Sequence, residues 1–362
     1  MAETLATPDL VARVRRDVER SLLRGRNGLK YLSGVGRPVL GQSARDTVWS
    51  SGKVELWRYR STQRTRQPPM LFVHSLVSRS YVFDLAPGNS FVEYMLGRGF
   101  DVFLVNWGEP DEIEADNDLE AYCDGYLPEI VQVVRRLAGT DEVNVFGYCF
   151  GGLLALLYAA GHPEDPIRSL AVMATPIDFQ HMGPMTGMMQ QGRVDPKDLI
   201  DETGNVPAEV IMNSFKLLQP TGDLTTYANL WQHLWNDDYV EAHQIMTQWA
   251  KDHIPFPGAC FLQVADLFAR DNLLASGEIP LGGRTVKLRD ITVPFLNIVG
   301  EKDHIVPPES TGRLSDLVGS ASAEELTLPA GHVGLIVGRS AHRRNLPAMA
   351  EWLERQTDEA DA

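Results

Sequence analysis

Residues 142–162, EVNVFGYCFGGLLALLYAAGH, join a buried strand to a helix through a sharp turn. The apolar strand pattern ends at Phe146, the turn is Gly147-Tyr148-Cys149-Phe150-Gly151, and an apolar helical pattern follows. Such a turn leaves no room for bulky side chains two positions before and after its central residue, and Gly147 and Gly151 meet that need. The pattern is typical of turns in which an enzyme exposes a nucleophile, here with cysteine in place of serine.

The turn directs the sulfur of Cys149 toward the edge of a sheet and the first turn of the following helix. The partial positive charge of a helix N-terminus favours a thiolate over a thiol, so we expect Cys149 to be a nucleophile. The alternative is a buried cysteine that packs as a small apolar residue, which is the common role of a free cysteine.

Apolar runs alternate with helical stretches along most of the chain, and each run is short and rich in Val, Leu, Ile and Phe. They are PPMLFVHS (68–75), GFDVFLVNW (99–107), DEVNVFG (141–147), SLAVMAT (169–175), VPFLNIVG (293–300) and AEELTLP (323–329). Such runs between helices predict parallel strands buried on both faces. Before them, residues 46–60 alternate polar and apolar around Ser51-Gly52, which predicts an opening β-hairpin. We therefore expect an α/β-hydrolase fold with a mostly parallel, doubly wound sheet.

Between residues 177 and 290 the alternation of strands and helices stops, and the patterns there are mainly helical. The stretch is too long for one crossover connection, so we interpret it as an inserted cap or lid. Residues 8–31 carry apolar residues at helical spacing among many arginines, which predicts an amphipathic helix. The expected organisation is a helical segment at 1–45, a core at 46–176 and 291–362, and a cap at 177–290.

A nucleophilic thiol needs a base, and in this fold the acid and the histidine follow the nucleophile along the chain. Asp303 follows the strand pattern 293–300, and His332 follows the strand pattern 323–329. We expect Cys149, Asp303 and His332 to form a catalytic triad. Taken singly, Asp303 could cap a turn and His332 could be an ordinary loop histidine. His304 is expected beside the triad, where it orients Asp303 or gates the site.

Acyl transfer also needs backbone donors for the oxyanion of its tetrahedral intermediate. The first is expected at Phe150, directly after the nucleophile, and the second near Leu76 or Val77, with Val77 preferred. Tyr81 lies in the same loop, where it either shapes the pocket or packs on the surface.

Composition excludes several classes of function. The net charge of −15 argues against broad binding to nucleic acid or to anionic membranes. Three cysteines, spaced far apart, favour neither a disulfide framework nor a zinc site, and we expect no metal and no cofactor. The N-terminus lacks the apolar segment of a secretory signal, and no apolar run approaches the ~20 residues of a membrane span. We therefore expect a cytoplasmic protein.

Together with the turn, further stretches make the sequence similar to the polyhydroxyalkanoate synthases, most closely the catalytic subunit of the short, two-subunit type. The stretches are GYCFGG, Asn106-Trp107-Gly108-Glu109-Pro110-Asp111, MATPIDFQ (173–180), TGNVPAEVIMNSFKLLQP (203–220), GGRTVKLRDITVPFLNI (282–298), KDHIVPP (302–308) and AGHVGLIVG (330–338). They extend over nearly the whole chain.

The resemblance implies polymerisation of (R)-3-hydroxyacyl-CoA into a polyester, with release of CoA and an acyl-enzyme on Cys149. It also implies a homodimer, a second non-catalytic synthase subunit, and a place at the surface of polyester granules. In this family Asp303 would help to activate the incoming hydroxyl. From residue types alone, Asp303 could equally serve only to orient His332.

Two other functions fit parts of the pattern. One is hydrolysis by a cysteine-dependent thioesterase, esterase or dienelactone-hydrolase-like enzyme, although such hydrolases are generally shorter and lack a comparable cap. The other is a granule-surface or scaffold protein that has kept the fold and lost the reaction. The products formed from 3-hydroxybutyryl-CoA would separate the first from a synthase, and alkylation of Cys149 would test the second.

Overall fold

The computed structural model describes residues 8–34, 39–61, 63–218, 222–338 and 340–359. It divides into two compact units: a helical unit formed by Met1–Leu40 and Gln219–Lys251, and a core unit formed by Gly41–Leu218 and Asp252–Ala362. Parts of the predicted segment 1–45, namely 1–7 and 35–38, lie outside the described residues.

The core unit is built on an eight-stranded sheet with the order β1-β2-β7-β4-β8-β9-β14-β15. Its strands are β1 (Arg45–Ser51), β2 (Val54–Tyr59), β4 (Met70–Val73), β7 (Val102–Asn106), β8 (Val143–Tyr148), β9 (Ile167–Met173), β14 (Phe295–Gly300) and β15 (Ala323–Leu328). From β7 to β15 every neighbouring pair is parallel. The β1–β2 hairpin adds to the edge in antiparallel fashion. The predicted α/β fold with a mostly parallel, doubly wound sheet is confirmed.

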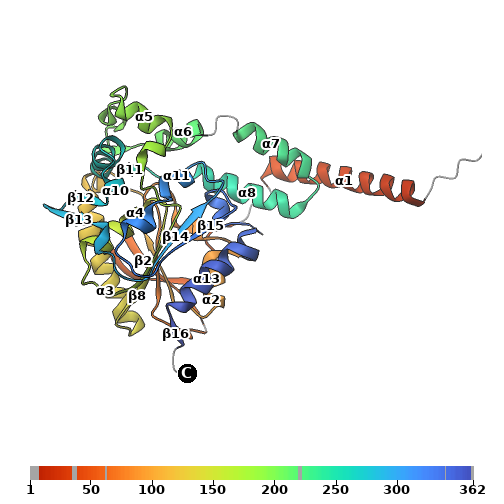
Figure 1. The fold of residues 1–362 in the computed structure, drawn as a ribbon. Helices are drawn as coiled ribbons and strands as arrows, with labels where there is room; N and C mark the ends of the chain where they lie inside the picture. The colour runs from red at the N-terminus through yellow and green to blue at the C-terminus, as the bar shows by residue number, and fades with distance from the viewer. Residues whose placement is uncertain (1–7, 35–38, 62, 219–221, 339, 360–362) are drawn as a thin grey trace, which may run out of the picture. The chain divides into compact units, whose positions relative to one another are not determined.

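Helices cover both faces of this sheet (Figure 1). They are α2 (Phe91–Gly97), α3 (Leu127–Ala138), α4 (Phe150–Gly161) and α13 (Leu346–Arg355). Because successive strand side chains point to opposite faces, Leu71 packs in the apolar cluster that includes α3 and α4. Phe72 instead contacts Phe91 of α2, with ring centroids 5.0 Å apart. The strands β4 and β8 are buried along their whole length, as continuous apolar runs predict.

Between β9 and β14 the core unit carries short helices and two small two-stranded sheets. They are α5 (Pro184–Gln190), β10 (Asn205–Val206), α6 (Ala208–Leu218), β11 (Phe256–Pro257), α9 (Gly258–Gln263), a π-helix (Val264–Arg270), α10 (Leu273–Ser276), β12 (Glu278–Leu281) and β13 (Arg284–Lys287). Residues 219–251 within this stretch belong to the helical unit. A cap with the boundaries 177–290 stays a prediction.

Shorter elements complete the core unit. They are β3 (Arg66–Gln67) paired with β16 (Asp358–Glu359), β5 (Asp84–Ala86) paired with β6 (Asn89–Ser90), a 3₁₀-helix (Ser80–Phe83), a π-helix (Ala121–Tyr126), α11 (Pro308–Thr311) and α12 (Leu314–Leu317).

The helical unit consists of α1 (Pro8–Ser33), α7 (Gly222–His233) and α8 (Asp237–Lys251). Leu230, Leu234 and Val240 form its apolar cluster. Arg26 donates to both carboxylate oxygens of Asp237, and the amide of Asn27 donates to the backbone oxygen of Leu234 at 2.8 Å. No helix in the described ranges is both long enough and apolar enough to cross a membrane.

Candidate active site

The turn between β8 and α4 holds Cys149 in a strained backbone conformation. Its φ is 55° and its ψ is −125°, a region that non-glycine residues rarely adopt. A Cβ on Gly147 would overlap the Cα of Gly152, and one on Gly151 would overlap the backbone oxygen of Val73. The glycines are therefore required by close approach of the chain, as the sequence pattern predicts. The side chain of Cys149 is partly exposed.

Asp303 and His332 follow the carboxyl ends of the neighbouring strands β14 and β15, and the structure brings them together. The Nδ1 of His332 lies 2.7 Å from Oδ2 of Asp303, and both side chains are buried. The other carboxylate oxygen of Asp303 accepts hydrogen bonds from the backbone N–H groups of Ile305 and Val306, each at 2.9 Å. The carboxylate is thus fixed on both oxygens and orients the imidazole ring.

The side chain of Cys149 also interacts with the ring of His332 and affects its pKa. Burial lowers the pKa of His332, but the charges of Asp303 and Cys149 and the hydrogen bond to Asp303 outweigh burial and raise the pKa to about 10. His332 can therefore hold a proton and a positive charge beside the sulfur at neutral pH. The ring of Tyr148 packs on His332 with centroids 4.9 Å apart, which limits the orientations open to the imidazole.

The candidate oxyanion donors lie on two segments. Phe150 is the first residue of α4, so its backbone N–H has no acceptor within its own helix. The backbone N–H of Val77, the preferred second donor, is directed to the Ser75 hydroxyl at 3.4 Å. Among the described residues, none accepts a hydrogen bond from the backbone N–H of Leu76, which is buried. The local geometry favours Leu76 over Val77 as a free donor.

The two remaining predicted residues lie apart from the Asp303–His332 pair. His304 is exposed, because the chain turns the side chain of Asp303 inward and that of the next residue outward. In the described part of the chain His304 makes no hydrogen bond or ring contact to Asp303 or His332. Tyr81 is half-buried and donates its hydroxyl to Oδ2 of Asp252 at 2.5 Å.

Two further residues near the site were not expected from sequence. Tyr148 sits between Gly147 and Cys149, and its contact with His332 depends on where β15 ends, which no local pattern gives. His74 directly follows β4 and is fully buried, and neither of its ring nitrogens has a hydrogen-bond partner among the described side chains and backbone groups. Burial lowers the pKa of His74 to about 3, so it is neutral.

The other two thiols are in different surroundings from Cys149. Cys123 and Cys260 are fully buried, and burial raises the pKa of both thiols well above its ordinary value. Each therefore stays protonated and shielded. Of the three, Cys149 is the thiol that a substrate can reach.

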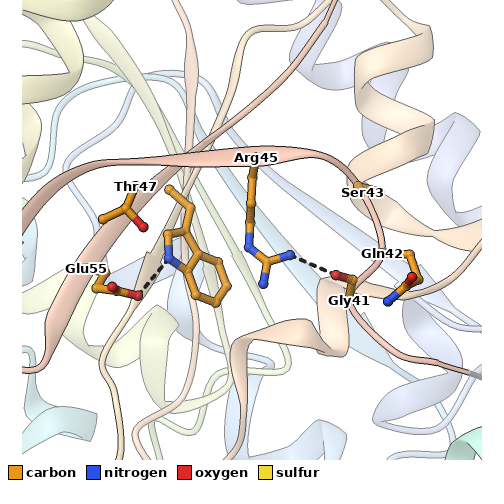
Figure 2. A pocket seen from close by; sticks show the side chains of 7 residues that line it. Gly41, Gln42, Ser43, Arg45, Thr47 and Glu55 are labelled. Carbon is orange, nitrogen blue, oxygen red and sulfur yellow. Dashed lines mark hydrogen bonds between the residues drawn. The ribbon is translucent and has the colours of Figure 1, made fainter.

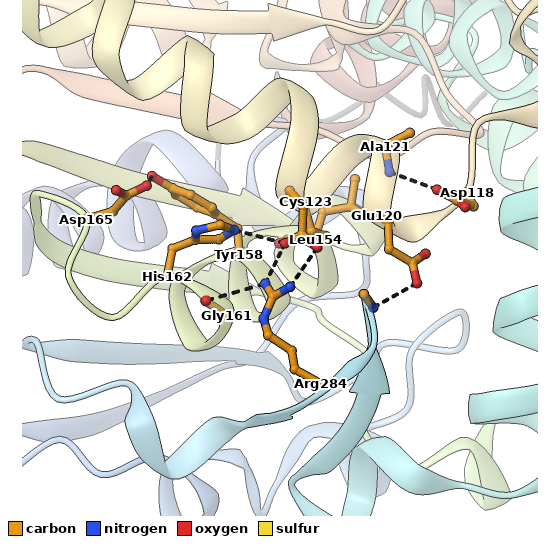
Figure 3. A network of polar contacts seen from close by, with 12 residues as sticks. Asp118, Glu120, Ala121, Cys123, Leu154, Tyr158, Gly161, His162, Asp165 and Arg284 are labelled. Atoms are coloured by element: carbon orange, nitrogen blue, oxygen red, sulfur yellow. Dashed lines mark hydrogen bonds and ion pairs between the residues drawn. The ribbon is translucent and has the colours of Figure 1, made fainter.

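A second histidine–aspartate pair occurs at the opposite end of α4 (Figure 3). Nε2 of His162 lies 2.9 Å from Oδ1 of Asp124. Arg284 of β13 donates to both oxygens of Asp124, at 2.6 and 3.0 Å. The N–H of Gly282 donates to Glu120 at 2.9 Å. This network ties the β12–β13 hairpin to the core.

A hollow of about 460 Å³ lies beside the β1–β2 hairpin (Figure 2) and is lined by Gly41, Gln42, Ser43, Arg45, Thr47, Glu55 and Trp57. The guanidinium of Arg45 stacks 4.0 Å from the centre of the Trp57 ring and donates to the Gly41 oxygen at 2.8 Å. Glu55 accepts from the Trp57 indole at 2.9 Å. Its two charged side chains, Arg45 and Glu55, thus each contact Trp57, and none of Cys149, Asp303 and His332 lines it.

Comparison with known proteins extends these observations. The family model of the alpha/beta hydrolase fold matches residues 68–339. The poly(3-hydroxyalkanoate) polymerase subunit PhaC of Allochromatium vinosum is 34% identical over 352 residues, which cover 96% of this chain and 97% of that protein. The subunit of the same name from Thiocystis violacea is 31% identical, and the match covers 97% of this chain and 98% of that protein. The PhaC subunit of Haloferax mediterranei is 34% identical over 330 residues, which cover 90% of this chain. The match covers only 66% of the longer Haloferax protein.

Solved structures share the fold at low sequence identity. A hydrolase from Pseudomonas aeruginosa PA01 has a TM-score of 0.51 at 16% identity, covering 86% of this chain and 98% of that one. A thermophilic esterase from Thermogutta terrifontis has a TM-score of 0.50 at 17% identity, covering 87% and 99%. These likenesses concern the fold alone.

Proposed function

This chain belongs to the poly(3-hydroxyalkanoate) polymerase family, whose members are acyltransferases, and on that premise we propose that it polymerises (R)-3-hydroxyacyl-CoA through an acyl-enzyme on Cys149. The carrying observation is the placement of one imidazole, His332, between the Asp303 carboxylate and the Cys149 thiol. Full-length alignment with the Allochromatium vinosum polymerase subunit supports the choice of reaction.

In the first step the thiolate of Cys149 attacks the thioester carbon of the substrate. The thiol proton resides on His332, whose raised pKa suits it to hold that proton until the leaving group needs it. The intermediate collapses, the bond to the CoA sulfur breaks, and His332 protonates the departing thiolate. One thioester replaces another, so the free energy of this step is nearly balanced.

In the second step the hydroxyl of another hydroxyacyl unit attacks the Cys149 thioester. His332 takes the hydroxyl proton and returns it to the cysteine sulfur as the C–S bond breaks. The product is an oxygen ester, which is more stable than a thioester, so chain growth is downhill. We assign Asp303 to orienting His332, because both of its oxygens already accept hydrogen bonds and its side chain is buried.

We place the oxyanion of both tetrahedral intermediates against the backbone N–H groups of Phe150 and Leu76. The choice of Leu76 over Val77 rests on the contact between the Val77 N–H and the Ser75 hydroxyl. A donor already bound to a neighbour would have to break that bond before it could stabilise the oxyanion. We propose that the stretch 177–290 covers the site, so that a hydroxyl rather than bulk water reaches the thioester.

The test is a product analysis with (R)-3-hydroxybutyryl-CoA. We expect stoichiometric release of CoA together with a polyester that makes the solution turbid and yields 3-hydroxybutyrate esters on methanolysis. Release of CoA with only free 3-hydroxybutyrate would make the chain a thioesterase. Absence of CoA release by the chain alone and with a co-expressed partner subunit would contradict the proposal.

We further propose a homodimer, a second non-catalytic subunit and a place at the surface of cytoplasmic polyester granules. The relatives carry the word subunit in their names, which supports an assembly with another chain. Sedimentation of the purified chain, alone and with a co-expressed partner, would test both assemblies. A monomer under both conditions would contradict them.

A further inference from the structure

The loop that carries Leu76 connects β4 to the 3₁₀-helix Ser80–Phe83. Its two ends are tied to the end of β7 and the residue after it. The indole N–H of Trp107 donates to the backbone oxygen of His74 at 2.9 Å, and the hydroxyl of Ser80 donates to Asn106 at 3.0 Å. These contacts fix where the loop begins and ends, but they leave its middle to other partners.

The middle of the loop pairs with residues 252–254, which lie more than 170 positions later in the sequence. The N–H of Ile254 donates to the backbone oxygen of Val77 at 3.4 Å, and Ser78 and His253 form an antiparallel bridge. The backbone around Leu76 is therefore positioned by a short partner segment that follows helix α8 in the sequence.

Asp252 fastens this pairing with its side chain. Oδ1 accepts a hydrogen bond from Nε of Arg79 at 2.9 Å, and Oδ2 accepts one from the hydroxyl of Tyr81 at 2.5 Å. Burial and the hydrogen bond to Asp252 raise the pKa of Tyr81, so the phenol keeps the proton that it donates. Arg79 also donates to Glu109 at 2.8 Å. One carboxylate thus holds the loop at two positions beyond Leu76.

We propose that Asp252 is a positioning residue for acyl transfer, which through Arg79 and Tyr81 holds the oxyanion-loop amide of Leu76 in place. The proposal rests on the proposed function for the reaction that the loop serves. Among the described residues, Asp252 hydrogen-bonds Arg79 and Tyr81 and not Cys149. Because Arg79 and Asp252 are 36% and 39% exposed, their ion pair contributes little to overall stability. Its loss should therefore alter the loop far more than the fold.

The test compares two reactions of the same sulfur. Acylation by 4-nitrophenyl acetate passes through a tetrahedral oxyanion and expels 4-nitrophenolate, so it needs the oxyanion donors. Alkylation by iodoacetamide forms a C–S bond at a saturated carbon and expels iodide, so no oxyanion develops. A misplaced loop slows the first reaction and spares the second, whereas general disruption of the site slows both.

For Asp252→Asn and Asp252→Ala we expect the acylation rate to fall about 10-fold, less than the loss of a whole oxyanion donor. The alkylation rate should stay within twofold of the wild-type rate. The Tm should stay within a few degrees of the wild-type value. Tyr81→Phe, which removes one of the two contacts, should lower acylation by a smaller factor. The matched control is Asp266→Asn, which breaks the exposed ion pair with Arg270 and should change neither rate.

Unchanged acylation in both Asp252 variants, or a parallel fall in acylation and alkylation, would overturn the proposal. Turnover of (R)-3-hydroxybutyryl-CoA by the wild-type chain is measured alongside. If that turnover fails while the Asp252 variants still lose acylation by the nitrophenyl ester, the proposed function fails and the positioning role stands. If polymer forms and the Asp252 variants are acylated at the wild-type rate, the proposed function stands and the positioning role of Asp252 fails.

Discussion

Helix α4 has a cysteine, a histidine and an aspartate near each of its two ends. At its N-terminal end lie Cys149, His332 and Asp303, with Nδ1 of His332 2.7 Å from Oδ2 of Asp303. At its C-terminal end His162 and Asp124 lie 2.9 Å apart, and Cys123 precedes Asp124 in the chain. Twelve helical residues separate the ends by roughly 18 Å. The two sets contain the same residue types in different surroundings.

The difference lies in burial and in what else each aspartate contacts. The side chains of His332 and Asp303 are 6% and 0% exposed, whereas those of His162 and Asp124 are 21% and 23% exposed. Arg284 neutralises Asp124, whereas among the described residues Asp303 hydrogen-bonds the His332 imidazole and two backbone N–H groups. The thiol of Cys123 is directed to the backbone oxygen of Leu154 at 3.6 Å. Residue types alone therefore do not distinguish a reactive set from a structural one.

The largest expected effect separates the two thiols. Cys149→Ala should abolish acyl transfer, with kcat falling roughly 10⁴-fold or more, because it removes the thiol that attacks the substrate in the proposed reaction. Cys123→Ala removes a buried apolar contact and should leave kcat within a few-fold of wild type. Steady-state CoA release from (R)-3-hydroxybutyryl-CoA measures both. Comparable losses in the two variants would erase the distinction between the two ends of α4.

The two histidines provide the next comparison. His332→Gln should lower kcat by about 10³-fold, because the thiol loses its base and the leaving sulfur loses its acid. His162→Gln keeps a hydrogen-bonding side chain at the C-terminal end and should change kcat by less than threefold. Rates are taken at saturating substrate, so that binding effects do not contribute. A large loss of kcat in the His162 variant would show that the His162–Asp124 network also contributes to acyl transfer.

Substitution of the two aspartates should affect different properties, kcat for Asp303 and thermal stability for Asp124. Asp303→Asn should lower kcat by roughly 10²- to 10⁴-fold, because the imidazole loses the charge that orients and stabilises it. Asp124→Asn leaves Arg284 without its carboxylate partner and should lower the Tm by a few degrees with little change in kcat. Thermal unfolding and CoA release are measured on both. A normal kcat in Asp303→Asn would show that orientation of His332 does not need the carboxylate.

The smallest effect concerns the pH dependence of stability. His332 binds its proton more tightly in the folded protein, with a pKa of about 10 against 6.5 for an ordinary histidine. The stability that it contributes is therefore complete below pH 6.5 and is lost as the pH rises through about 10. Between pH 6 and 10 the Tm of wild type should fall more steeply than that of His332→Gln. Parallel curves for the two proteins would contradict the raised pKa.

Sequence patterns specified the features that depend on local sterics and periodicity. The glycines around Cys149 predict the sharp turn because any Cβ there would overlap another part of the chain. Continuous apolar runs predict the parallel strands, and the ends of β14 and β15 then bring Asp303 and His332 to one edge. The hairpin turn is at Gly52-Lys53, one residue later than the alternation suggests.

Features that depend on the path of a loop or on distant partners could not be predicted in this way. Whether Leu76 or Val77 offers a free N–H depends on the rotation of single peptide units, which apolar patterns do not report. His304 neighbours Asp303 in sequence, but its side chain faces solvent. Asp252 contacts Arg79 across 173 positions, and no local signal links the two.

The central claim is that the substrate acylates Cys149 in particular. The direct measurement is mass spectrometry of peptides from the chain quenched in acid within seconds of mixing with (R)-3-hydroxybutyryl-CoA. We predict one or more 3-hydroxybutyryl units on the peptide that contains Cys149, and none on the peptides that contain Cys123 or Cys260. Polymer formation with no adduct on the Cys149 peptide, or continued polymer formation by Cys149→Ala, would contradict the account.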